Sequence, residues 1–165
     1  MSNPILEYGI STLTFTRGAL ERLYSDFPKD KLCHQPFPGA NHALWTMGHL
    51  ATADEYFLQK VGNRPTTRFD ELQGIFFMKS IPSAHAKDYP AFEEVQAYFR
   101  DARERLIAYF RSLTPEQLAE PLDPQMKQFA ADRGILMRSI AWHEGFHTGQ
   151  LAVVRKALNI PTAFG

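Results

Sequence analysis

Apolar residues recur at intervals of three and four along most of the chain, which predicts α-helices rather than β-strands. Prolines and helix-capping residues divide this pattern into four long segments. We expect helices over residues 3–26, 41–62, 90–113 and 132–159. Few stretches alternate between apolar and polar residues for long enough to form strands. The chain is therefore predicted to be all-α.

Residues 63–89, between the second and third expected helices, interrupt the helical pattern. They contain two prolines, scattered polar groups and the apolar patch GIFFM, which favours a long crossover with short helical pieces. The connection after the third helix includes Thr114 and Gln117 at capping-box spacing. Four long helices with one long crossover predict a four-helix bundle, which we expect to form a single domain over residues 1–165.

Composition narrows the classes of function. Eighteen Lys and Arg residues balance eighteen Asp and Glu residues, so no overall field attracts nucleic acid or an anionic membrane. Neither a signal peptide nor an apolar run of about 18 residues is present, which predicts no membrane partner. Cys33 is the single cysteine and cannot form an internal disulfide. We expect a cytoplasmic protein.

The stretch AWHEGFHTGQLAVV, residues 141–154, places two histidines on the apolar face of the last expected helix. That face comprises Leu136, Ile140, His143, His147, Leu151, Val154 and Leu158. Imidazoles on a buried face need polar partners. Side chains four residues apart project from the same side of a helix, so both histidines can bind one metal ion. A hydrogen-bonded pair of core histidines fits the same spacing.

A catalytic metal site usually needs a third protein ligand. Glu144 between the two histidines gives the His-Glu-x-x-His pattern of zinc peptidases, but no acidic residue or further histidine follows His147. The third ligand must then lie upstream, and His49 in the second expected helix is our candidate. His42 lies two turns earlier, about 10.5 Å along the axis, and is expected at the rim. The predicted metal ligands are His49, His143 and His147.

Other residues near these histidines are candidates for supporting roles. Trp45, Tyr56 and Gln150 are expected to line a pocket, with ordinary packing as the alternative. Glu144 lies about 100° around the helix from His143 and so borders the metal face. It is our candidate catalytic residue, as a proton acceptor or as a partner of an imidazole N–H. An ordinary carboxylate at the edge of the core fits its position equally well.

The third expected helix carries several arginines that an anionic ligand could use. Acidic residues lie among them, which favours a solvated helix face instead. The arginines are Arg100, Arg103, Arg105 and Arg111, and the acidic residues are Asp101 and Glu104.

The segments NHALWTMGHLATADEYFL and HEGFHTGQLAVVRKALNIP together resemble the DinB family, or DinB/YfiT-like superfamily, of helical metalloproteins. The resemblance extends to the SLTPEQLAEPLD segment, the chain length and the order of four helices. It implies a four-helix bundle with a divalent metal held by three histidines near one open end, here His49, His143 and His147. Members of the family are often homodimers, so the resemblance also implies a homodimer.

The resemblance also implies a class of reaction. Characterised members include thiol S-transferases that use bacillithiol or related thiols, and a mycothiol-dependent maleylpyruvate isomerase. We therefore expect the metal to deprotonate a low-molecular-weight thiol, which then attacks an electrophile. The alternatives are a metal-dependent hydrolase and a noncatalytic stress protein that binds a metal or ligand. Imidazole ligands make zinc the default ion, with nickel or manganese as alternatives.

Overall fold

Helices make up the regular structure of the computed structural model, which describes residues 3–164 and contains no strand within them. The four long helices are α1 (Pro4–Tyr24), α2 (Ala43–Lys60), α4 (Phe92–Arg111) and α6 (Arg133–Ala157). Shorter elements are α3 (Phe69–Phe76), α5 (Pro115–Ala119) and the 3₁₀ helices η1 (Lys29–Lys31) and η2 (Ala86–Asp88). The predicted all-α class is confirmed.

Capping side chains fix where several helices begin. The Asp132 carboxylate accepts a hydrogen bond from a backbone N–H in the first turn of α6. Thr114 and Gln117 form the expected capping box at the start of α5. At α2 the capping residue is His42 rather than Asn41, because the Nδ1 atom of His42 accepts a hydrogen bond from the backbone N–H of Trp45. The second helix therefore begins slightly later than the sequence pattern suggests.

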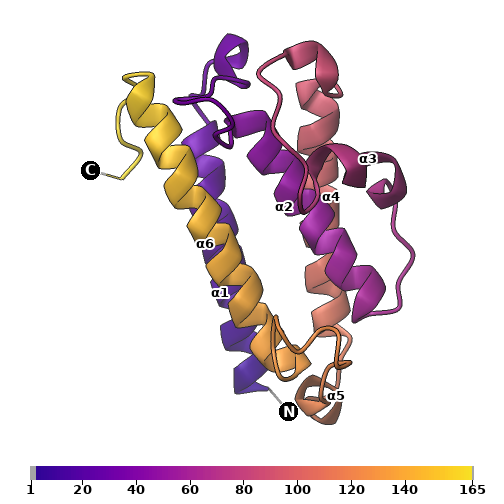
Figure 1. The fold of residues 1–165 in the computed structure, drawn as a ribbon. Helices are drawn as coiled ribbons and strands as arrows, with labels where there is room; N and C mark the ends of the chain where they lie inside the picture. Colours follow the sequence, from indigo (N-terminus) through magenta and orange to yellow (C-terminus); the bar gives the residue numbers. More distant parts are fainter. Residues whose placement is uncertain (1–2, 165) are drawn as a thin grey trace.

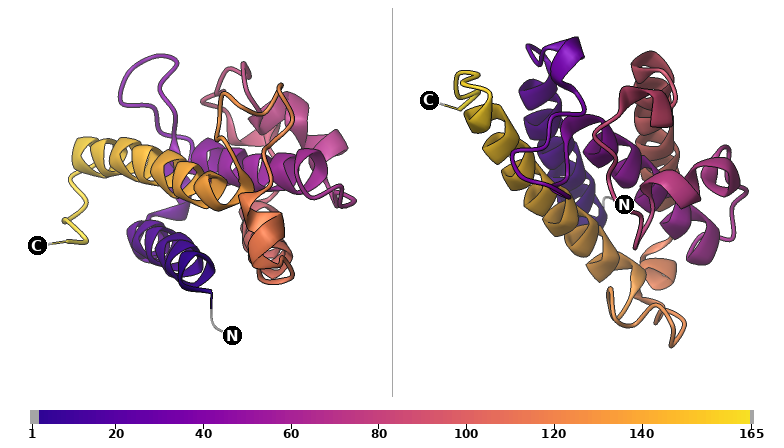
Figure 2. Two further views of the ribbon diagram at one scale, coloured as in Figure 1. Left: turned by 90° about the horizontal axis from the view of Figure 1, so that it is seen from below. Right: turned by 45° about the horizontal axis from the view of Figure 1, so that its top comes forward.

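The long helices associate chiefly as two pairs, α1 with α6 and α2 with α4 (Figure 1). Helices α1 and α6 run in one direction, and α2 and α4 run in the other. The chain leaving α2 must therefore return along the length of the molecule before α4 can begin. Residues 61–91, which include α3 and η2, make this return. The α1–α2 loop and the α5–α6 loop lie at opposite ends of the helices (Figure 2).

Two apolar clusters fill the space between the helices. One includes Leu20 of α1, Leu50 of α2, Phe99 of α4 and Leu151 of α6. The other includes Leu13 of α1, Leu58 of α2, Phe110 of α4 and Leu136 of α6. Buried charged residues from all four long helices lie between the members of the two clusters, and four of them pair with one another. These four residues are Arg17, Asp54, Arg103 and Glu144, and we call them the charged layer.

The burial of Arg103 corrects the expectation of a solvated arginine face on this helix. Its relative exposure is 3%, whereas Arg100 and Arg111 on the same helix are exposed. Buried acidic partners from other helices explain the difference, because a guanidinium rarely leaves water unless it is paired.

None of the helices in residues 3–164 has the length and apolar character that a membrane crossing requires.

Candidate metal centre

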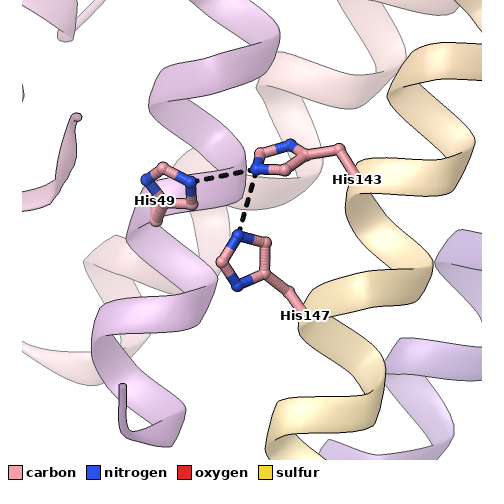
Figure 3. Close-up of side chains that lie close together, drawn as sticks. All are labelled: His49, His143 and His147. Atoms are coloured by element: carbon pink, nitrogen blue, oxygen red, sulfur yellow. Dashed lines mark hydrogen bonds between the residues drawn. The ribbon is translucent and has the colours of Figure 1, made fainter. Parts of the chain in front are cut away.

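The three histidines singled out in the sequence lie together in the structure (Figure 3). His49 comes from α2, whereas His143 and His147 lie one turn apart on α6. The Nε2 atom of His143 is 3.1 Å from Nε2 of His49 and 3.0 Å from Nε2 of His147. Nitrogen ligands about 2.1 Å from a tetrahedral zinc ion lie about 3.4 Å apart. The side chains therefore fit a metal ion with small adjustments, and this group could hold one.

Hydrogen bonds at the Nδ1 atoms of His49 and His147 select the tautomer that can bind a metal through Nε2. The Nδ1–H of His49 donates to the Phe76 carbonyl oxygen at 2.8 Å, and the Nδ1–H of His147 donates to Gln150 Oε1 at 2.8 Å. Both partners are oxygens that can only accept, so each Nδ1 carries the proton and each Nε2 keeps its lone pair. Gln150 Oε1 is itself held by the Asn41 side-chain amide at 3.0 Å. These partners orient the rings so that their Nε2 atoms lie close to Nε2 of His143, where the group could hold an ion.

A glycine permits the contact that orients His49. A Cβ atom at Gly48 would lie 2.4 Å from the Phe76 ring, so only glycine lets the end of α3 approach α2 this closely. The Trp45 indole stacks on the His49 imidazole with 4.6 Å between ring centroids. Its N–H donates to the Ile75 carbonyl and to the side chain of a nearby serine. The residues of α3 and those just after it thus hold the His49 imidazole at its Nδ1 edge directly and at one ring face through Trp45.

Burial keeps the three imidazoles neutral near pH 7. It lowers the pKa of His49 to about 4 and that of His147 to about 3, and in both cases the neighbouring imidazoles lower the pKa further. The pKa of His143 is also lowered, chiefly by burial. Protons therefore compete weakly with a metal ion for the lone pairs at neutral pH.

A cavity of about 510 Å³ opens beside this group, and His49 and His143 form part of its wall. Tyr56 also lines it, as the sequence suggested. Trp45 and Gln150 are not among its lining residues and instead contact His49 and His147. The remaining wall is Ala53, Phe57, Phe77, Met78, Gln128, Phe129, Arg138, Ser139 and Trp142. Its volume falls within the range of pockets that bind small molecules.

The Glu144 carboxylate belongs to the charged layer, although it directly follows His143. Its Oε1 accepts from Arg17 Nε at 2.6 Å, and its Oε2 accepts from Thr16 Oγ1 and Arg103 Nη1, both at 2.7 Å. Burial alone raises the pKa of this carboxyl, but the two guanidinium groups outweigh it and the pKa is lowered. Glu144 is therefore ionised at neutral pH and fully hydrogen-bonded. Its role in catalysis stays a prediction.

Asp54 completes the charged layer. It accepts from Arg103 at 2.8 and 3.1 Å and from Arg17 at 3.1 Å, so each long helix contributes one residue and the charges cancel. The layer joins α2 and α6, the two helices that carry the histidines. Sequence reasoning missed it, although Arg17 lies between Leu13 and Leu20 on the apolar face of α1 and so signals a buried cation.

Other histidines and the cysteine lie outside the three-histidine group. His42 is fully buried rather than at a rim, and its Nε2 lies 2.9 Å from the Ser83 carbonyl oxygen. A larger cavity, of about 740 Å³, is lined by Cys33 and His34 but by none of the three grouped histidines. Burial raises the pKa of the Cys33 thiol, so this thiol is not activated. The metal chemistry therefore points to the smaller cavity.

Comparison with known proteins agrees with this geometry. A family model described as the DinB superfamily matches residues 12–151. The matched range contains His49, His143 and His147 together with all four residues of the charged layer. No curated protein gives a significant match to the chain.

Proposed function

The chain belongs to the DinB superfamily, and we propose that it is a metal-dependent enzyme that activates a low-molecular-weight thiol for transfer to an electrophile. The observation that carries this proposal is that two of the three histidines form part of a cavity wall. Three protein ligands leave a coordination position open, as catalytic zinc sites do. A small molecule in the cavity would lie beside that position, which supports catalysis over a closed, noncatalytic metal site.

Zinc is the ion that we propose. The three ligands are all imidazole nitrogens, which suit zinc and nickel better than manganese, an ion that prefers oxygen ligands. When bound, the ion would supply Lewis acidity that lowers the pKa of a thiol and favours the nucleophilic thiolate.

The surrounding residues hold the histidines and shape the reaction space. The Phe76 carbonyl and Gln150 fix the ring orientations of His49 and His147. The largely apolar walls exclude water, which preserves the reactivity of a thiolate. In the proposed transfer, a carbon–sulfur bond forms while the leaving group departs with its bonding electron pair, and the thiol proton passes to solvent.

The position of Glu144 supports thiol transfer over hydrolysis. Activation of water is commonly assisted by a nearby proton acceptor. The Glu144 carboxylate is held by Arg17 and Arg103 in the charged layer, so it is poorly placed to accept a proton in the cavity. A thiol is a stronger acid than water and depends less on such a base.

The proposal also concerns location and assembly. Low-molecular-weight thiols are kept reduced inside cells, so we propose a cytoplasmic location. We also propose a homodimer formed through α1 and α6, which lie side by side and expose large apolar side chains. These are Ile5, Tyr8, Phe15, Trp142, Phe146 and Val153. Sedimentation analysis of the wild type and Phe146→Glu tests this, since a wild-type monomer at micromolar concentration would contradict it.

An adduct-formation assay tests the enzymatic proposal. Purified zinc-loaded protein is incubated with monobromobimane and one of several thiols, including cysteine, glutathione and bacillithiol. We expect faster adduct formation with at least one thiol, and loss of this acceleration after chelation. Thiol-independent hydrolysis of a nitrophenyl ester would favour the hydrolase instead. Absence of both activities in metal-loaded protein would favour a noncatalytic binding protein.

Metal analysis of variants tests the ligand assignment separately. We expect His49→Ala, His143→Ala and His147→Ala each to abolish stoichiometric zinc binding, because two imidazoles bind zinc much more weakly than three. His85→Ala is the control, since His85 is exposed and lies outside the group. Full zinc retention by the triple variant would refute the assignment.

A further inference from the structure

We propose that the cavity beside His49 and His143 binds the electrophile, and that this electrophile is an organic anion with an apolar, ring-containing body and its charged group on Arg138. This inference rests on the proposed function, because it identifies the substrate class of the same site. It depends on the walls of the cavity, on the charge at Arg138 and on the distance between Arg138 and the histidines.

Aromatic side chains form much of the wall and pack against one another. The ring centroids of Tyr56 and Phe77 are 5.0 Å apart, and those of Phe57 and Phe129 are 5.4 Å apart. Such contacts hold the wall in place before a ligand enters, which reduces the entropy lost on binding. Flat apolar walls favour a ring-containing body. Small cellular thiols are strongly polar and fit this surface poorly, so we assign the cavity to the electrophile.

Arg138 places a positive charge on this apolar wall. Among the described residues that line the cavity, it is the only Lys, Arg, Asp or Glu. None of the ion pairs found within residues 3–164 involves Arg138. The exposed Arg138 guanidinium is therefore available to a ligand, and its fork of N–H donors matches a carboxylate or similar anion.

Helix geometry separates the charge from the reacting centre. Arg138 lies five residues before His143 on α6, about 7.5 Å along the helix axis. Ser139 and Trp142 lie between them and line the same cavity. A ligand whose anionic group binds Arg138 therefore extends its body along this wall toward the histidines. The reacting carbon is expected at the end of the ligand away from the charge.

Binding measurements on zinc-loaded protein test this inference without measuring catalysis. The probes are 4-phenylbutyrate, 4-phenylbutanol and acetate, titrated by calorimetry into the wild type, Arg138→Gln and Arg138→Lys. Arg111→Gln is the matched control, because Arg111 is also exposed on a long helix and is not a lining residue of the cavity. Zinc content is measured for each protein and matched between them. Direct binding of a carboxylate to the metal then contributes equally to the affinities of the wild type and the variants.

We expect 4-phenylbutyrate to bind the wild type about tenfold more tightly than either 4-phenylbutanol or acetate. The advantage over the alcohol should disappear in Arg138→Gln, persist in part in Arg138→Lys and be unchanged in Arg111→Gln. Equal binding of acid and alcohol by the wild type, equal binding of acetate and 4-phenylbutyrate, or an unaltered preference in Arg138→Gln would overturn the inference. Anion selectivity in a protein that transfers no thiol would instead refute only the proposed function.

Discussion

The Glu144 carboxylate accepts a hydrogen bond from the Arg103 guanidinium at 2.7 Å in the interior of the protein. His143, the residue directly before Glu144, instead lines the cavity. Two consecutive residues of α6 thus face different surroundings, His143 the cavity and Glu144 the charged layer. Through Asp54, the same layer also reaches α2, which carries His49. The layer therefore fixes how the two histidine-bearing helices sit relative to one another.

Removing the Arg103 guanidinium should destabilise the fold strongly. We expect Arg103→Met to lower the free energy of unfolding by about 3–5 kcal/mol, because it leaves Asp54 and Glu144 with one buried cation between them. Arg100→Met on the same helix is the matched control, since Arg100 is exposed and its nearest carboxylate is 3.8 Å away. That variant should lose less than about 1 kcal/mol. Equal losses in urea denaturation would show that the layer does not stabilise the fold.

Gln150 should influence metal affinity without touching the metal. In Gln150→Leu, the His147 Nδ1–H loses its acceptor, and we expect zinc to bind about 10–100-fold more weakly. Gln150→Glu keeps an acceptor oxygen and should retain most of the affinity. Competition with a chromophoric chelator measures both variants. Wild-type affinity in Gln150→Leu would mean that this hydrogen bond does not orient the ring.

Gly48 and Gly18 provide a matched pair of helix glycines. An added Cβ at Gly48 meets the Phe76 ring, whereas one at Gly18 meets nothing within 4 Å. We expect Gly48→Ala to destabilise the protein by about 1–3 kcal/mol and to weaken zinc binding by displacing the Phe76 carbonyl from His49. Gly18→Ala should stabilise it by up to about 1 kcal/mol. Thermal unfolding and zinc titration measure both effects, and a stabilised Gly48→Ala protein would contradict the close approach of α3.

The metal-free protein should lose stability as the pH falls. The pKa of His49 is about 4 in the folded state and near 6.5 when the chain is unfolded, so the unfolded state binds more protons between these values. The free energy of unfolding should therefore decrease from about pH 6.5 downward, by on the order of 3 kcal/mol for His49 by pH 4. Urea denaturation after chelation, at pH 7.5, 6 and 5, measures the slope. His49→Gln should show a shallower slope, and stability that does not change between pH 7.5 and 5 would disprove buried neutral imidazoles.

The sequence by itself determined the features that depend on local spacing. Helical periodicity predicted the all-α class, and capping chemistry placed Asp132 and Thr114 at helix starts. Spacing of four residues placed His143 and His147 on one side of a helix, and the lack of a downstream ligand led to His49. The helix assignments and the shared face of His143 and His147 agree with the structure, because a regular helix fixes which side chains share a face, whatever surrounds it. His49 lies beside them, and its role as a metal ligand stays a prediction.

The tertiary structure alone decided what lies opposite each face. Glu144 is about 100° from His143 around α6, which leaves open whether its carboxylate faces the histidine group or the interior. Arg17 and Arg103 from other helices hold this carboxylate in the interior. Arg103 has acidic neighbours in the sequence, and this pattern predicted a solvated side chain. In the folded protein, helix packing places Asp54 beside it instead. Burial of a charge depends on whether a partner arrives from a distant segment, and local sequence does not specify that partner. The same limit applies to the cavity, whose walls come from α2, α6 and two connecting segments.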